Sequence, residues 1–236
     1  MAQDKSYILA IETSTDACSV AIIENEETLA ESRLDEPRMQ SARLAPMIDK
    51  LLKDNSLTMK AFAAVAVSKG PGSYTGLRVG VSMAKGLCFG ASKPLIGVGT
   101  LDILAAQGRA CDGGEEADFI VPMIDARRME VYQAVYDKNC TILGEIEPKI
   151  LDENSYLDLL EKGVVLFCGD GCAKFEEIIN HPNARFFPCS PEARYMAKIA
   201  RQKLLASDFE DVAYMEPFYL KDFRIGQSKK NILGLR

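Results

Sequence analysis

Short apolar runs alternate with polar turns along this chain, and the order of elements that they predict occurs twice. Runs of roughly four to eight apolar residues are typical of buried strands, whereas apolar residues spaced three or four apart predict amphipathic helices. The first half is predicted to contain strands at 7–11, 17–23 and 27–34, a helix at 42–53, a strand at 63–68, a helix at 75–90, a strand at 95–98 and a helix at 100–109. The second half is predicted to contain strands at 119–124, 129–136 and 143–150, a helix at 155–161, a strand at 164–167, and helices near 173–179 and 192–206.

The repeated order of elements predicts an α/β protein with two lobes of related topology. The boundary is expected near residue 100, which gives an N-terminal lobe at 1–100 and a C-terminal lobe at 101–215. Two similar α/β lobes imply a cleft between them. Residues 216–236 are expected to form a loop-like segment with a solvated basic tail, whose cations are Lys221, Arg224, Lys229, Lys230 and Arg236.

The helix predicted at 75–90 has too narrow a polar face for an ordinary surface helix. Its clearly polar side chains, Arg78, Ser82 and Lys85, form a single stripe, whereas a surface helix usually has a wide polar face. We therefore expect a partner to cover part of this helix. Two rows are candidates for the covered surface, namely Gly76, Gly80 and Ala84, and Val79, Met83 and Leu87 with Gly86 and Gly90. One row must face the sheet of its own lobe, and the sequence does not decide which one.

The helix predicted at 42–53 has one apolar face. That face is formed by Leu44, Met47, Ile48, Leu51 and Leu52. Pro46 lies inside the same stretch and lacks a backbone N–H. The helix is therefore expected to start late or to bend at Pro46.

A glycine-rich turn, Gly70-Pro-Gly72, joins the strand at 63–68 to the second helix. Glycine tolerates positive φ and proline fixes its own φ, so the chain turns sharply here. Ser73 or Thr75 is expected to cap the helix, whose first N–H groups form a candidate anion site. A hydrolase nucleophile at Ser73 is disfavoured because Pro71 and Thr75 stand where the Gly-x-Ser-x-Gly motif requires glycine.

Composition argues against several other classes of function. The net charge is −6 and the pI is about 5.0, whereas proteins that bind nucleic acid unaided usually have a basic surface. The seven cysteines are scattered and form no Cys-x-x-Cys pair, and most lie in an apolar context, which predicts that most are buried, reduced thiols of a cytoplasmic protein. His181 is the single histidine, which leaves too few ligands for a typical zinc site, so no metal is expected. No segment has the length of a membrane span, so no membrane partner is expected.

Two polar turns are candidates to line the cleft. The turn at 12–16 offers the hydroxyl groups of Thr13, Ser14 and Thr15, and the turn at 125–128 offers Asp125 and Arg127. Such groups can hold a phosphate or a phosphate-bound water, so weak binding of ATP or ADP is one interpretation. Gly169-Asp-Gly171 is a third turn of this kind. The alternative is that all three are ordinary polar turns, with Asp125 paired to a neighbouring arginine.

Several segments resemble one known family. They are Ile8-Leu-Ala-Ile-Glu-Thr-Ser-Thr15, Ser68-Lys-Gly-Pro-Gly-Ser-Tyr-Thr-Gly-Leu-Arg-Val-Gly80, Gly97-Val-Gly-Thr-Leu101 and Ile124-Asp-Ala-Arg-Arg128. The overall plan resembles the superfamily of actin, heat-shock chaperone ATPases and sugar kinases (ASKHA), in which two RNase H-like lobes enclose ATP. The segments themselves resemble the bacterial TsaB (YeaZ) family of tRNA threonylcarbamoyladenosine biosynthesis proteins. This resemblance extends over almost the whole chain.

The resemblance implies a scaffold rather than an enzyme. TsaB is the non-catalytic relative of TsaD, the transferase that modifies adenosine beside the tRNA anticodon, and TsaE is an ATPase that joins the complex. By resemblance, this chain would bind and activate TsaD, form a homodimer without it, and reach tRNA only through the complex. The implied interface uses the two N-terminal helices and would include Leu44, Met47, Ile48, Leu51, Arg78, Val79, Ser82, Met83, Gly86 and Leu87. No catalytic residue is implied, and no cofactor beyond weakly bound ATP or ADP, or a nucleotide at the interface of the complex.

Two positions depart from the family pattern. Gln40 stands where members often have histidine, and Met129 stands where the Asp-Ala-Arg hairpin usually has glycine. A side chain at 129 is expected to narrow a phosphate loop, which weakens the nucleotide hypothesis and leaves the helix surface untouched. The alternative function is an ATP-dependent phosphotransferase or ATPase of the same fold.

Overall fold

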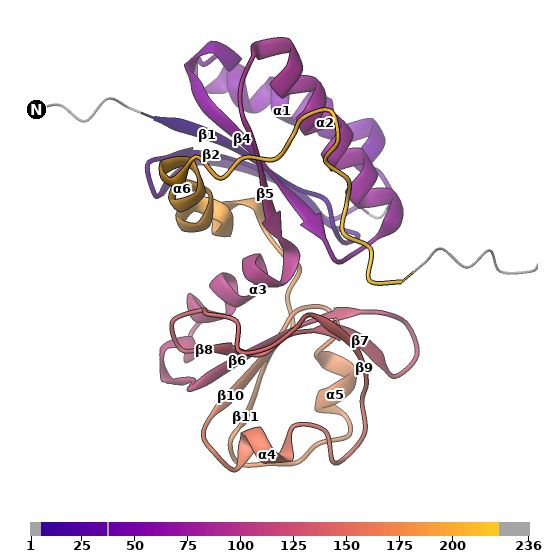
Figure 1. Ribbon diagram of the computed structural model, residues 1–236. Coiled ribbons are helices and arrows are strands. Elements are labelled where there is room, and N and C mark those ends of the chain that lie inside the picture. Colours follow the sequence, from indigo (N-terminus) through magenta and orange to yellow (C-terminus); the bar gives the residue numbers. More distant parts are fainter. Residues whose placement is uncertain (1–5, 37, 222–236) are drawn as a thin grey trace, which may run out of the picture.

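The structure is a computed structural model that describes residues 6–36 and 38–221. Its two lobes are stacked in Figure 1, and each is built around one mixed β-sheet. The predicted α/β class with two lobes is therefore confirmed. The tail cations Arg224, Lys229, Lys230 and Arg236 lie outside the described residues.

The first sheet has five strands in the order β3-β2-β1-β4-β5. These strands are β1 (Tyr7–Glu12), β2 (Cys18–Glu24), β3 (Glu27–Leu34), β4 (Phe62–Gly70, preceded by the 3-10 turn η1, Met59–Ala61) and β5 (Leu95–Gly99). Strands β1, β2 and β3 form an antiparallel meander, while β4 and β5 run parallel to β1.

Strand β1 is buried on both faces of this sheet. Successive side chains of a strand point to opposite faces. Leu9 and Ile11 pack beneath α1 (Gln40–Asp54) and α2 (Tyr74–Ala91), whereas Ile8 and Ala10 belong to the cluster on the other face. Burial on both sides explains why the sequence of this strand is continuously apolar and does not alternate between apolar and polar residues.

Helix α1 starts earlier than the sequence predicts. It begins at Gln40 and continues through Pro46, so the prediction of a late start is wrong. The Gln40 side-chain amide donates to the carbonyl oxygens of Thr15 and Asp16, each at 3.0 Å. These bonds attach the first turn of the helix to the β1–β2 turn and fix its starting point.

Segments from late in the chain help to cover the other face of the first sheet. They are the 3-10 turn η3 (Ala193–Met196) and α6 (Ala197–Ala206), which lie beside the upper sheet in Figure 1. Met196 and Ala200 are fully buried there, and the N–H of Ala193 donates to the Ser19 hydroxyl at 2.8 Å. Residues 193–206 therefore pack with the N-terminal lobe, which corrects their assignment to a C-terminal lobe at 101–215.

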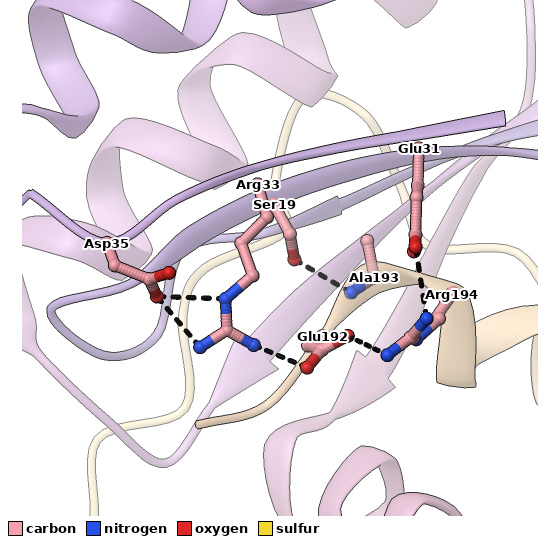
Figure 2. A network of polar contacts seen from close by, with 7 residues as sticks. All are labelled: Ser19, Glu31, Arg33, Asp35, Glu192, Ala193 and Arg194. Atoms are coloured by element: carbon pink, nitrogen blue, oxygen red, sulfur yellow. Dashed lines mark hydrogen bonds and ion pairs between the residues drawn. The ribbon is translucent and has the colours of Figure 1, made fainter. Parts of the chain in front are cut away.

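A network of ion pairs attaches this returning segment to the edge strand β3 (Figure 2). Arg33 pairs with Asp35 at 2.8 Å and also with Glu192. Arg194 pairs with Glu192 at 2.7 Å and with Glu31 at 3.0 Å. Glu192 is thus shared by two arginines from distant parts of the chain. The same charges occupy a sheet edge that could otherwise pair with another strand.

The second lobe repeats the plan of the first. Its sheet has the order β11-β10-β6-β7-β9, with β8 paired to β6. The elements are the 3-10 turn η2 (Gly114–Glu116), strands β6 (Phe119–Asp125), β7 (Glu130–Gln133), β8 (Tyr136–Asp137) and β9 (Glu147–Ile150), helix α4 (Leu157–Leu160), strand β10 (Val165–Cys168), helix α5 (Ala173–Glu176) and strand β11 (Ala184–Phe187). Strand β6 has antiparallel neighbours on one side and parallel ones on the other, as β1 does.

Two predicted strands of this lobe are shorter in the structure. The strand predicted at 129–136 is interrupted between β7 and β8. In the strand predicted at 143–150, only the residues of β9 form a strand. Residues 141–145 are exposed, so their apolar members have no core to face. Helix α3 (Thr100–Arg109) lies between the lobes, with Leu104 packed on the second sheet and Ile103 in the core of the first.

Residues 209–221, the C-terminal strap, run back over the first lobe and along α2 (Figure 1). Glu210 forms a β-bridge to β5, and Met215 is buried in the core beside α2. The Lys85 ammonium group of α2 donates to the carbonyl oxygens of Ala213 and Met215 at 2.9 and 3.1 Å. The strap is therefore held against α2 without forming a helix or strand of its own.

The described residues contain neither a helix long and apolar enough to cross a membrane nor a group of three side chains suited to hold a metal ion. The cysteines are free thiols, and Cys18, Cys88, Cys168 and Cys172 are buried as predicted. Burial raises the pKa of Cys18 to about 12 and that of Cys88 to about 11. These two thiols therefore stay protonated near neutral pH.

Candidate functional site

Helix α2 presents one row of small residues to its own lobe. A Cβ at Gly76 would lie 2.1 Å from the carbonyl oxygen of Thr13, and a Cβ at Gly80 would lie 2.2 Å from Thr13 Oγ1. Ala84, the next member of the row, is fully buried. The Thr13 hydroxyl also donates to the Gly76 carbonyl at 2.8 Å. This row lets α2 lie directly on the end of β1, which answers the question that the sequence left open.

The opposite face of α2 is open and mostly apolar. With the start of α1 it forms a groove lined by Ser41, Tyr74, Thr75, Arg78, Val79, Ser82, Met83, Gly86 and Leu87. All six α2 residues predicted for the interface line this groove. A Cβ at Gly86 or Gly90 would meet no atom within 4 Å. Glycine inside a helix costs about 0.5–1 kcal/mol relative to alanine, and no contact within the described chain requires it at these positions.

Helix α1 contributes less to this surface than predicted. Leu44 is fully buried, and Ile48 and Leu51 are 4% and 6% exposed, because all three pack between α1 and the sheet. These side chains belong to the core, which corrects their assignment to a contact surface. Met47 is half-buried, and Ser41 in the first turn reaches the groove.

Phe89 extends the apolar surface beyond the groove. Its side chain is 86% exposed near the end of α2. Helical spacing places it on the same face as Ser82, seven residues earlier. Phe89 could not be recognised from the sequence, because one more apolar residue on a largely apolar helix carries no signal until the orientation of the helix is known.

A second hollow lies between the lobes and is lined by both predicted turns. Ser14 and Thr15 come from the first lobe, and Asp125 and Arg127 come from the second. Thr13, predicted with them, is fully buried and bonded to Gly76 instead, so its hydroxyl is not available to a ligand. The predicted cleft therefore brings together four of its five candidate residues.

The N-terminus of α2 is occupied by the protein itself. The N–H of Ser73 donates to the carbonyl oxygen of Ser14 at 2.6 Å. The Ser73 hydroxyl caps the helix by accepting from the N–H of Gly76 at 3.3 Å, so Ser73 rather than Thr75 is the cap. The Gly76 N–H, one of the helix groups expected to hold an anion, and the N–H of the cap residue are thus already bonded, which argues against the anion site predicted at this turn.

Asp125 forms an ion pair with a residue from a distant part of the chain. Its carboxylate forms an ion pair with Lys174 of α5 and accepts from the N–H of Arg127 at 2.7 Å. The alternative that Asp125 pairs with a neighbouring arginine therefore holds only for the backbone N–H of Arg127, and the ion pair is made by a lysine from a distant helix. Asp170 accepts from the N–H of Asp125 at 2.9 Å. Loss of solvent, and to a lesser extent the Asp125 charge, raises the pKa of Asp170 to about 6.

Glu12 lies buried at the end of β1, below the first of these turns. Its Oε1 accepts from the N–H of Ser14 at 2.5 Å. Burial raises the pKa of Glu12 to about 7, and hydrogen bonds from Ser14 and Ser68 only partly oppose this. Glu12 Oε2, Ser14 Oγ and Thr15 Oγ1 are buried and have no hydrogen-bond partner among the described residues. The turn behind the cleft therefore contains buried oxygens that are incompletely bonded within the described residues.

Several named proteins are similar to this chain over most of its length. The TsaB protein of Haemophilus influenzae, named a tRNA threonylcarbamoyladenosine biosynthesis protein, is 32% identical over 224 residues, which cover 91% of this chain and 93% of the relative. This chain belongs to the TsaB family. TsaB of Bacillus subtilis is 34% identical over 178 residues, with 73% of this chain and 74% of the relative covered. TsaB of Escherichia coli is 40% identical over 153 residues, covering 62% and 64%.

Two further matches support the TsaB assignment and the fold. Residues 36–224 match the family model described as TsaD: tRNA N6-adenosine threonylcarbamoyltransferase. The solved structure of YeaZ from Pseudomonas aeruginosa is 28% identical, with a TM-score of 0.78, and it covers 91% of this chain and 100% of its own. The resemblance to the TsaB (YeaZ) family seen in the sequence is therefore confirmed.

Proposed function

We propose that this TsaB-family chain is a non-catalytic subunit that binds and activates a TsaD-type transferase in tRNA threonylcarbamoyladenosine biosynthesis. The open face of α2 carries this proposal. It combines half-buried Val79, Met83 and Leu87 with two glycines whose missing side chains leave room for a second helix. The match to the TsaD family model supports a partner with related lobes, so that like helices can pack against each other.

A specific but moderate association is expected from the side chains of this surface. Full burial of one large apolar side chain contributes roughly 1.5–3 kcal/mol, and Val79, Met83 and Leu87 are already half-buried. Loss of translational and rotational freedom offsets much of that gain. Phe89 adds an exposed aromatic ring at one end of the surface. In the absence of the transferase, we expect the same face to pair two copies of this chain.

The hydrogen bonds of the candidate catalytic side chains favour a supporting role over catalysis. The Ser73 hydroxyl caps α2, and His181 accepts the N–H of Asn183 at 3.2 Å in a turn. With a net charge of −6, the chain is expected to meet tRNA through the complex rather than alone. A TsaE-type ATPase is the expected third component, and the cytoplasm is the expected site of action.

Association with the transferase can be tested by size-exclusion chromatography of the two purified proteins, together with an assay of tRNA modification. Met83→Asp places a charge in the groove, and Gly86→Leu fills open space without an internal clash. Both variants should abolish co-elution and reduce modification. Gln202→Asp on the exposed side of α6 is the matched control and should behave as wild type. Separate elution of the wild-type proteins, or full modification by both groove variants, would contradict the proposal.

A second candidate function is an ATPase or phosphotransferase acting in the cleft. It is favoured by the two turns that face each other there and by the unbonded oxygens of Ser14 and Thr15. The occupied end of α2 and the Asp125–Lys174 pair argue against it. Calorimetric titration with Mg-ATP decides between the two. Micromolar binding that disappears in Asp125→Ala would favour the enzyme.

A further inference from the structure

The end of the C-terminal strap is anchored on the first lobe beside the glycine-rich turn. The N–H of Phe218 donates to the carbonyl oxygen of Lys69 at 2.6 Å. Gly70 has a φ of +114°, and a Cβ there would lie 2.4 Å from the carbonyl oxygen of Phe218. The strap therefore passes so close to Gly70 that a side chain would displace it.

Beyond this anchor the strap packs against the start of α2. The rings of Tyr219 and Tyr74 lie 4.9 Å apart between centroids. The guanidinium of Arg78 lies 4.7 Å from the centre of the Tyr74 ring. Tyr74 lines both the α2 groove and the cleft between the lobes. One ring thus touches the strap, the candidate docking surface and the cleft.

The last described residue of the strap reaches the other lobe. Lys221 forms an ion pair with Glu130 on β7. Tyr219, Leu220 and Lys221 all line the cleft. The lobes are joined covalently at Gly99–Thr100 and through the segment between β11 and η3, and they also pack together through α3. The strap adds a non-covalent tie across the cleft.

We propose that residues 217–221 are a latch that holds the two lobes closed over the cleft and opens it when released. Its fixed part ends at Phe218, and among the described residues the part that crosses the cleft is held at Tyr219, by Tyr74 and Arg78, and by the Lys221–Glu130 ion pair. The Lys221 and Glu130 side chains are 44% and 22% exposed, and a solvent-exposed pair contributes little to stability. Segments with few buried contacts open independently of the rest of the fold.

The latch is connected to the α2 surface through Tyr74. A molecule that docks on the groove contacts Arg78 and Tyr74, and these two side chains support Tyr219. Docking and opening of the cleft would then influence each other. The latch itself does not depend on which partner binds, so it can be tested on the isolated chain.

Accessibility of the cleft can be measured with a fluorescent reporter. The chain has no tryptophan, so Tyr132→Trp, at a residue that lines the cleft, provides a single probe for quenching by neutral acrylamide. In this background, Lys221→Glu places like charges together and should raise the quenching constant about two- to five-fold. The charge swap, Lys221→Glu with Glu130→Lys, should restore the original value. Tyr219→Ala should raise it by a similar factor because the ring contact is lost.

Tyr214→Ala is the matched control, since Tyr214 lies in the same strap with its side chain 82% exposed. Amide exchange of residues 124–130, measured without the tryptophan, gives a second reading in case the reporter perturbs folding. Unchanged quenching and exchange in Tyr219→Ala and Lys221→Glu would overturn the latch. So would an equal rise in Tyr214→Ala, or a charge swap that stays as accessible as Lys221→Glu.

Discussion

Thr13 fills the space that a side chain at Gly80 would need, since a Cβ there would lie 2.2 Å from Thr13 Oγ1. Gly86 lies further along the same helix, and a Cβ there would meet no atom within 4 Å. Two glycines of one helix thus have opposite surroundings. Gly80 is required by the fold of the lobe, whereas no contact of the described chain explains Gly86.

Alanine substitutions at these two glycines should change stability in opposite directions. Gly80→Ala should lower the free energy of unfolding by roughly 1–3 kcal/mol, because the methyl group overlaps a buried, hydrogen-bonded side chain. Gly86→Ala should raise it by about 0.5–1 kcal/mol through better helix propensity. Urea denaturation of both variants measures the difference, and each serves as the control for the other. Equal effects of the same sign would show that the two faces of α2 are wrongly assigned.

Glu12 should make the protein less stable as the pH rises from about 4.5 to about 7. Burial raises the pKa of Glu12 from 4.5 to about 7, so over this range the folded state holds a proton that the unfolded state has lost. Stability contributed by this group is therefore complete below the lower pKa, falls between the two values, and stays low above the higher one. A pKa shift of this size changes the free energy of unfolding by on the order of 3 kcal/mol.

Glu12→Gln should remove this dependence, because the amide is neutral and its oxygen can still accept the N–H of Ser14. The variant should be more stable than wild type by about 1–3 kcal/mol at pH 8 and close to wild type near pH 4.5. Denaturation at both pH values tests this, with the exposed Glu116→Gln as control. A stability difference that is the same at both pH values would contradict the assignment of a raised pKa.

Glu192 should be the most sensitive member of the ion-pair network at the edge of the first sheet. Its side chain is 13% exposed and pairs with both Arg33 and Arg194. Glu192→Gln leaves two partly buried arginines without this shared carboxylate and should cost roughly 1–3 kcal/mol of stability. Asp35→Asn, at a side chain that is 66% exposed, should cost less than about 0.5 kcal/mol. Thermal unfolding of both variants compares them, and an equal loss would mean that burial of Glu192 has no role.

The open apolar face of α2 could be expected from the sequence, because an excess of apolar residues on a helix is visible without a structure. Its period shows which residues share a face, but not which face meets the sheet. That choice depends on Thr13, which belongs to a different element and approaches Gly76 and Gly80 only in the folded chain. Gly86 and Gly80 are indistinguishable in the sequence for the same reason.

That the sequence does not show which face of a helix meets the sheet also explains why three residues of α1 were wrongly assigned to the partner interface. Leu44, Ile48 and Leu51 form a regular apolar face, and such a face has the same spacing whether it covers a core or meets a partner. Lys174 and Lys221 could not be foreseen in the cleft either, because each arrives from a segment far from the residue it pairs with. The two lobes could be predicted because the same order of elements occurs twice along the chain, and the structure has one mixed sheet in each lobe.

The return of η3 and α6 to the first lobe has a consequence for synthesis on the ribosome. Ile8, Ala10, Ala21 and Ile23 need Met196 and Ala200 to be covered, and these residues are made only after the whole second sheet. Until then the nascent first lobe exposes part of one apolar face, a state that favours aggregation or binding by chaperones. The first lobe can therefore complete its folding only after the second lobe has been translated.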